Sequence, residues 1–176
     1  MRAIFPAALV LAGLAAPAIA EDNYLPRTVV AAALDKADCE LPIDSVTQFD
    51  PVDLGGGLKL VQVSCWAAAY NFGAILFAVD PQARDKARLL QFKTVEDGKL
   101  TTTYSMDLPR FDAETKTLAT LHKGRGVGDC GTAGAWRWNG HDFDLTGFWD
   151  KEKCDGKPFE PGAQTVKYRV YPPRRK

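Results

Sequence analysis

The side chains best placed to do chemistry lie in one short segment, residues 123–131, which reads Lys-Gly-Arg-Gly-Val-Gly-Asp-Cys-Gly. Lys123, Arg125 and Asp129 put two cations and a carboxylate among four glycines, and so many glycines predict a tight loop with positive φ at several of them. Arg125 and Asp129 can pair to hold the loop, which is the role that we favour. The alternative is that Lys123, Arg125 and Asp129 bind a ligand, since loops on rigid scaffolds often carry function.

The same segment contains Gly126-x-Gly128-x-x-Gly131, which has the spacing of a dinucleotide-binding fingerprint. That fingerprint needs a following helix whose N-terminus holds the pyrophosphate. Residues 136–138 follow instead, and they alternate in the manner of a strand. We therefore reject a nucleotide site and predict no cofactor.

Groupings typical of catalytic or metal sites are scarce. The only histidines are His122 and His141, and no serine lies in a Gly-x-Ser-x-Gly motif. On a strand, His141 points away from Asp142 and Asp144, so we predict no metal site. Carboxylates are plentiful enough for a glycosidase-like pair, but no spacing singles one out. We assign no catalytic residue.

Aromatic side chains form the other candidate group. Trp136 and Trp138 share one face of an expected strand, and Trp66 and Tyr70 lie close together earlier in the chain. We expect these residues mainly in the core, because a domain of this size needs large side chains inside. Aromatic residues also anchor interfaces and sugar-binding surfaces, so Trp136 joins the three loop residues as a candidate ligand-binding residue.

The four cysteines predict disulfides, because an even number in an exported chain favours bridges. None belongs to a Cys-x-x-Cys pair, which argues against a zinc ribbon or a redox motif. Three pairings are possible. We favour Cys39–Cys65 with Cys130–Cys154, since each closes a short loop.

Residues 1–20 have the order of a secretory signal peptide. A positive start at Arg2 precedes an apolar run that ends in Ala18-Ile19-Ala20, and Glu21 follows. The run just reaches the length of a membrane span, but it is rich in alanine and contains proline. We predict cleavage after Ala20, a periplasmic or secreted location, and no integral membrane segment in the mature chain.

The mature chain, residues 21–176, is predicted to be a single disulfide-bonded domain. It carries 21 basic and 22 acidic residues once Arg2 is removed, so it lacks the field that gathers nucleic acid. A helix is expected from Pro26 to about Asp38. About eight strands follow, which predicts a mainly β, antiparallel barrel or sandwich. Their expected ranges are 58–65, 74–79, 87–92, 100–104, 117–122, 135–138, 141–149 and 165–170.

Two segments resemble the motifs of a family of secreted proteobacterial proteins catalogued as a domain of unknown function. Residues 65–71 are similar to its Cys…(Gly/Ala)-Ala-Tyr-Asn motif, and residues 123–131 match its Lys-Gly-Arg-Gly-x-Gly-Asp-Cys-Gly motif. Ala67 and Ala68 replace a polar residue and a glycine, and longer members carry an additional N-terminal half. The resemblance covers roughly residues 39–170. It implies a periplasmic, bridged fold and supplies no activity.

These observations support two classes of function. The first is a periplasmic, non-catalytic binding module for an unknown protein or envelope component, and inhibition of host cell-wall hydrolases is a narrower form suggested by architecture alone. The alternative is a hydrolase that cuts cell-envelope polymers with a pair of carboxylates. A deep cleft with two facing carboxylates favours the enzyme, whereas a loop-based polar surface favours binding.

Overall fold

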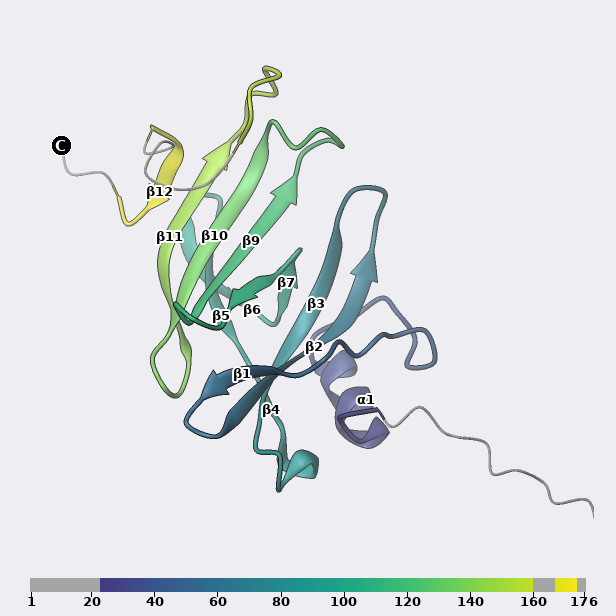
Figure 1. The fold of residues 1–176 in the computed structure, drawn as a ribbon. Coiled ribbons are helices and arrows are strands. Elements are labelled where there is room, and N and C mark those ends of the chain that lie inside the picture. The colour runs from purple at the N-terminus through teal and green to yellow at the C-terminus, as the bar shows by residue number, and fades with distance from the viewer. Residues whose placement is uncertain (1–22, 160–166, 174–176) are drawn as a thin grey trace, which may run out of the picture.

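The computed structural model describes residues 23–159 and 167–173, and the expected signal peptide lies outside this part of the chain. One α-helix and twelve strands occur in the described residues, which confirms a mainly β, antiparallel fold (Figure 1). Two five-stranded sheets and one two-stranded hairpin make up the structure. Within the described residues, no helix has the length and apolar character needed to cross a membrane.

Helix α1 spans Arg27–Lys36, as its apolar spacing predicts. The fixed φ of Pro26 suits a helix start, and its carbonyl accepts hydrogen bonds from the amides of Val29 and Val30. The buried side chains of α1 face the first sheet, where Val61 and Val63 lie in the same apolar cluster. The helix is thus held by one apolar face.

The first sheet has the order β1-β2-β3-β4, and β7 also pairs with β3. Side chains alternate along β2, so Val61 and Cys65 face α1 whereas Leu60 faces the second sheet. Cys65 forms a disulfide with Cys39, which fixes the segment after the helix to this strand. The strands of this sheet are β1 (Val52–Gly55), β2 (Leu58–Ala67), β3 (Phe72–Val79), β4 (Arg88–Leu89) and β7 (Ser105–Asp107).

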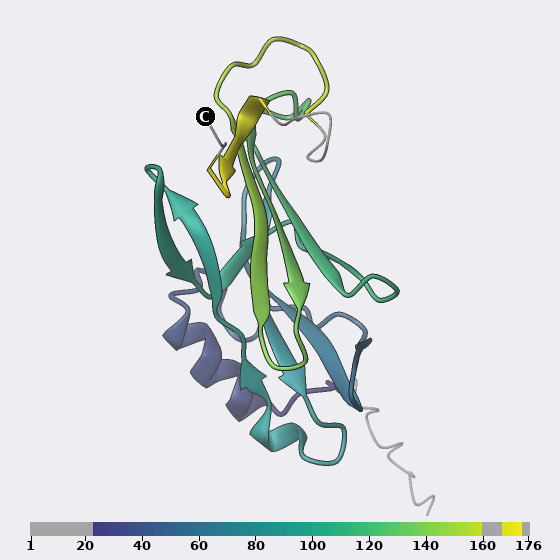
Figure 2. The same cartoon turned by 90° about the vertical axis from the view of Figure 1, so that its left-hand side faces the viewer.

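The second sheet has the order β12-β11-β10-β9-β8 and packs against the first in the manner of a sandwich. The shared core contains Leu76 from the first sheet and Trp136 and Phe143 from the second. Figure 2 shows the β5–β6 hairpin beside the second sheet, and its Phe92 enters the same core. The remaining strands are β5 (Phe92–Glu96), β6 (Lys99–Thr103), β8 (Arg110–Asp112), β9 (Thr117–Lys123), β10 (Gly131–Trp138), β11 (Phe143–Lys151) and β12 (Arg169–Tyr171).

Several strand boundaries differ from those expected. The single strand predicted at residues 87–92 is divided between β4 and β5, because the amide of Leu90 still bonds to Leu76 of the first sheet before the chain crosses over. The turn at Asn139-Gly140 has four residues, so β11 begins at Phe143. The side-chain oxygen of Asn139 accepts hydrogen bonds from the amides of the two residues after Gly140, which lengthens the turn. The structure also has more strands than the eight expected. The strands β1, β7 and β8 were not predicted, because each is too short to give a clear alternating pattern in the sequence.

Candidate functional site

The two motif segments meet at one end of the molecule, although they are far apart in the sequence (Figure 1). The side-chain amide of Asn71 donates to the Lys123 carbonyl (3.0 Å), and its oxygen accepts from the Lys123 amide (2.9 Å). Asn71 therefore bonds both backbone groups of Lys123, as a residue of a neighbouring strand does. This contact joins the turn after β2 to the loop after β9.

The turn and the loop together present four side chains, Tyr70, Lys123, Arg125 and Val127, which we call the loop platform. Tyr70 is 58% exposed and Val127 is 76% exposed, so two exposed side chains with large apolar surfaces belong to this one platform. A Cβ at Gly126 would lie only 2.9 Å from the Tyr70 ring, so the ring packs on bare backbone. Glycine at this position lets the loop support Tyr70 without covering it.

A pair of opposite charges holds the loop from within. Arg125 donates to both carboxylate oxygens of Asp129, with Nε–Oδ1 at 2.7 Å and Nη2–Oδ2 at 2.5 Å. The amide of Gly156 donates to the same carboxylate. The Asp129 side chain is 4% exposed whereas that of Arg125 is 49% exposed, so the pair is anchored by its buried acid. Hydrogen bonds from Arg125, and a further one from Gly156, hold the pKa of Asp129 well below its usual range despite its burial.

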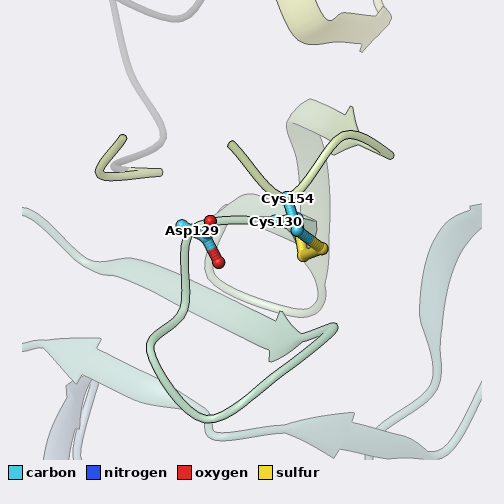
Figure 3. A group of neighbouring side chains, drawn as sticks. All are labelled: Asp129, Cys130 and Cys154. Atoms are coloured by element: carbon cyan, nitrogen blue, oxygen red, sulfur yellow. A yellow bond between two sulfur atoms is a disulfide. The ribbon is translucent and has the colours of Figure 1, made fainter. Parts of the chain in front are cut away.

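The disulfide Cys130–Cys154 adds a covalent anchor beside Asp129 (Figure 3). Ligand atoms of Asp129, Cys130 and Cys154 lie within 4.8 Å of one another, a spacing that a metal ion could use. The two sulfurs are bonded to each other in a disulfide, however, whereas a cysteine binds a metal ion as a free thiolate. We assign this group a structural role. Both bridges in the structure have the pairing favoured from the sequence.

Trp136, the fourth candidate residue, lies apart from the loop. Its side chain is 1% exposed in the core between the sheets, and its indole N–H donates to the Lys93 carbonyl (2.8 Å). The ring lies over Gly134, where a Cβ would overlap it. The structure thus brings Lys123, Arg125 and Asp129 into one loop and places Trp136 at the floor of a separate cleft.

This polar cleft has a volume of about 500 Å³ and lies between the β5–β6 hairpin, β7 and the inner face of β9 and β10. His122 Nδ1 lies 3.1 Å from Asp107 Oδ2, and the Trp66 indole donates to the Ser105 hydroxyl (3.1 Å). Burial raises the pKa of Asp107, although His122 opposes that rise. The sequence offered no reason to connect these residues, because β7 is short, was not among the expected strands, and belongs to a different sheet from β9.

Two side chains have roles that the sequence did not predict correctly. Tyr70 was expected in the core and is exposed, because it lies in the turn between β2 and β3 and has no strand face to follow. His122, to which the sequence assigned no role, contacts Asp107 in the cleft.

Comparison with known proteins identifies relatives without an assigned activity. The profile of a family described as "Protein of unknown function (DUF1176)" matches residues 6–170. The Escherichia coli (strain K12) protein described as "Uncharacterized protein YpfG" is 31% identical over 97 residues, which make up 54% of this chain. Those residues cover 28% of that relative's length. No solved structure matches the chain.

Proposed function

We propose that this chain, which belongs to the DUF1176 family of proteins of unknown function, is a non-catalytic binding module that works outside the cytoplasm. It recognises a protein or envelope component through the loop platform. The observation that supports this proposal is the exposure of Tyr70 and Val127 on or beside a loop that is anchored by a disulfide and by an ion pair with a buried acid. Two disulfides support a location outside the reducing cytosol.

The composition and rigidity of the platform suit recognition. Tyrosine and arginine are enriched among the residues that dominate binding energy at interfaces. A loop that is already ordered loses little conformational entropy when a partner binds. The one acid of this loop, Asp129, is buried and paired with Arg125, so the charged groups that the loop presents are the half-exposed Arg125 and the partly exposed Lys123. A partner with carboxylates around an apolar centre fits this arrangement best.

Site-specific photocrosslinking tests the proposal in cells that export the chain. Val127 is replaced by photoreactive benzoylphenylalanine, and we expect a discrete adduct with an envelope component. The matched control carries the same group at Leu100, which is 56% exposed on β6 and is not part of the platform, and it gives no such adduct. Adding Tyr70→Ala to the Val127 variant should weaken the adduct. Equal adducts from both positions, or none from Val127, contradict the proposal.

A second candidate, a hydrolase acting on cell-envelope polymers, is favoured by one observation. The cleft contains two carboxyl groups, those of Glu96 and Asp107, and burial raises the pKa of Asp107 above its usual range. A carboxyl with a raised pKa is suited to donate a proton as a general acid.

Dye-labelled peptidoglycan separates the two candidates. If the chain is a hydrolase, the wild type releases soluble dye and Asp107→Asn lowers that rate by about a hundredfold or more. If it is a binding module, as we expect, the wild type releases no more dye than buffer does.

A further inference from the structure

The polar cleft arises from a change of side-chain type along three neighbouring strand faces. On β5 the inward residues run from Phe92 to Thr94 and Glu96, and on β9 they run from Leu118 to Thr120 and His122. The inward face of β10 likewise changes from Trp136 to the hydroxyl-bearing residue at position 132. Each strand carries its apolar residue into the core and its polar residues to the same end. The sheets therefore enclose a cavity lined by polar groups at that end.

Hydroxyl groups dominate the walls of this cleft. Six threonines and one serine line it, together with two indoles, two carboxyl groups, one imidazole and the apolar side chains of Val95, Met106 and Phe148. Lysine and arginine are absent from its described lining. Hydroxyls both donate and accept hydrogen bonds, so they match ligands that carry many hydroxyl or amide groups. The two carboxyl groups, with no lysine or arginine opposite them, disfavour an anionic ligand.

The aromatic rings in the cleft are held in fixed positions. Trp66 lies over Gly73, where any Cβ would overlap the indole nitrogen, and its N–H donates to Ser105. Trp66 is partly exposed, so one portion of its ring faces the cleft. An indole in a fixed orientation gives a flat apolar surface at little cost in side-chain entropy. Such a surface suits the apolar face of a sugar ring.

His122 supplies a polar group with a defined orientation. Its Nδ1 lies against Asp107, so Nε2 is the ring nitrogen that a ligand can bond. The His122 side chain is 44% exposed, which leaves the ring accessible to a ligand. The cleft therefore offers an imidazole nitrogen, several hydroxyls and an aromatic surface within one cavity.

We propose that this cleft is a second binding site, separate from the loop platform, and that it binds a neutral oligosaccharide. The volume of about 500 Å³ is in the range of small-molecule sites. Binding needs no chemical step, so it does not depend on the hydrolase alternative. It also does not require the platform to have a partner.

Calorimetric titration of the mature protein with maltotriose, cellotriose, mannotriose and chitotriose tests the proposal, and trigalacturonate is the charged comparison. We expect saturable binding of at least one neutral trisaccharide, a change in tryptophan fluorescence, and weaker binding of trigalacturonate. The variant His122→Gln should weaken binding by about tenfold, the size of one good hydrogen bond. Thr101→Val, which removes a hydroxyl from the hairpin wall, should have a similar effect.

The matched control is His141→Gln. His141 also contacts an aspartate through Nδ1, at 2.8 Å from Asp142, but it lies outside the cleft and is 79% exposed. This variant should bind as the wild type does. The proposal is overturned if no neutral trisaccharide binds at concentrations up to about 10 mM. It is also overturned if trigalacturonate binds as tightly as the neutral sugars, or if the two histidine variants bind equally.

Discussion

Arg125→Ala and Asp129→Ala should each lower the melting temperature by on the order of 10 °C, whereas Lys123→Ala should change it by no more than about 2 °C. Removing Arg125 takes two hydrogen bonds away from a carboxylate that is 4% exposed, and among the described residues backbone groups such as the Gly156 amide remain as its partners. Removing Asp129 takes the acceptor away from both Arg125 and Gly156. Lys123 is held by hydrogen bonds between its backbone groups and the Asn71 side chain, and these bonds do not involve the Lys123 side chain. Thermal unfolding followed by circular dichroism measures all three.

The pH dependence of the same transition identifies the charged pair as the cause. Arg125 lowers the pKa of Asp129 in the folded state, so the pair stabilises the fold above the unfolded carboxyl pKa of about 4. That stabilisation decreases progressively as the pH falls below this value, because the unfolded chain binds a proton at Asp129 that the folded state binds only at a much lower pH. The difference in melting temperature between the wild type and Asp129→Asn should therefore shrink below about pH 4. A difference that is constant with pH, or three alanine variants that melt like the wild type, contradicts the structural role.

Gly131→Ala should prevent folding or lower the melting temperature by more than about 10 °C. Gly131 has a φ of +128°, and a Cβ there would overlap the carbonyl oxygen of His122 on the adjacent strand. The side chain can be accommodated only if β9 and β10 separate at the base of the loop platform. Yield of soluble protein and thermal unfolding are the measurements.

Gly140→Ala is the matched control for this effect. Gly140 also has a positive φ, +102°, but a Cβ there would meet no atom within 4 Å. Its alanine variant should therefore be destabilised only by the strained backbone conformation, and its melting temperature should fall by about 3 °C. If the two variants melt at similar temperatures, the clash with His122 is not the reason that glycine is needed at position 131.

The sequence predicted best those elements whose two faces meet different surroundings. β2 could be placed because Val61 and Val63 pack against α1 while Gln62 does not, so polarity alternates along it. The turn at Asp97-Gly98 could be placed because both residues adopt positive φ, which this dipeptide tolerates. The longer turn after Trp138 could not be predicted, since it depends on hydrogen bonds that the Asn139 side-chain oxygen accepts from the amides of His141 and Asp142.

The candidate site was harder to predict, because its members are brought together by packing between sheets. Arg125 and Asp129 are close in the sequence, and their pairing follows from that proximity. The contact of Tyr70 with Gly126 requires the turn of one sheet to meet the loop of another, which no local pattern encodes. The cleft left a weak signal in β9, where Leu118 is followed at alternate positions by a threonine and a histidine. On its own this pattern is typical of any strand that leaves the core.

The bridge between Cys130 and Cys154 makes the anchoring of the loop depend on whether these two cysteines have been oxidised. It joins the loop platform to a segment 24 residues later, beside the point where Gly156 donates to Asp129. While the thiols are kept reduced, as in the cytosol, this covalent tether is missing and only the ionic and hydrogen-bonded contacts hold the loop. If the chain works outside the cytoplasm as a binding module, as we propose, oxidation completes the loop only after export, and association with a partner during synthesis is disfavoured.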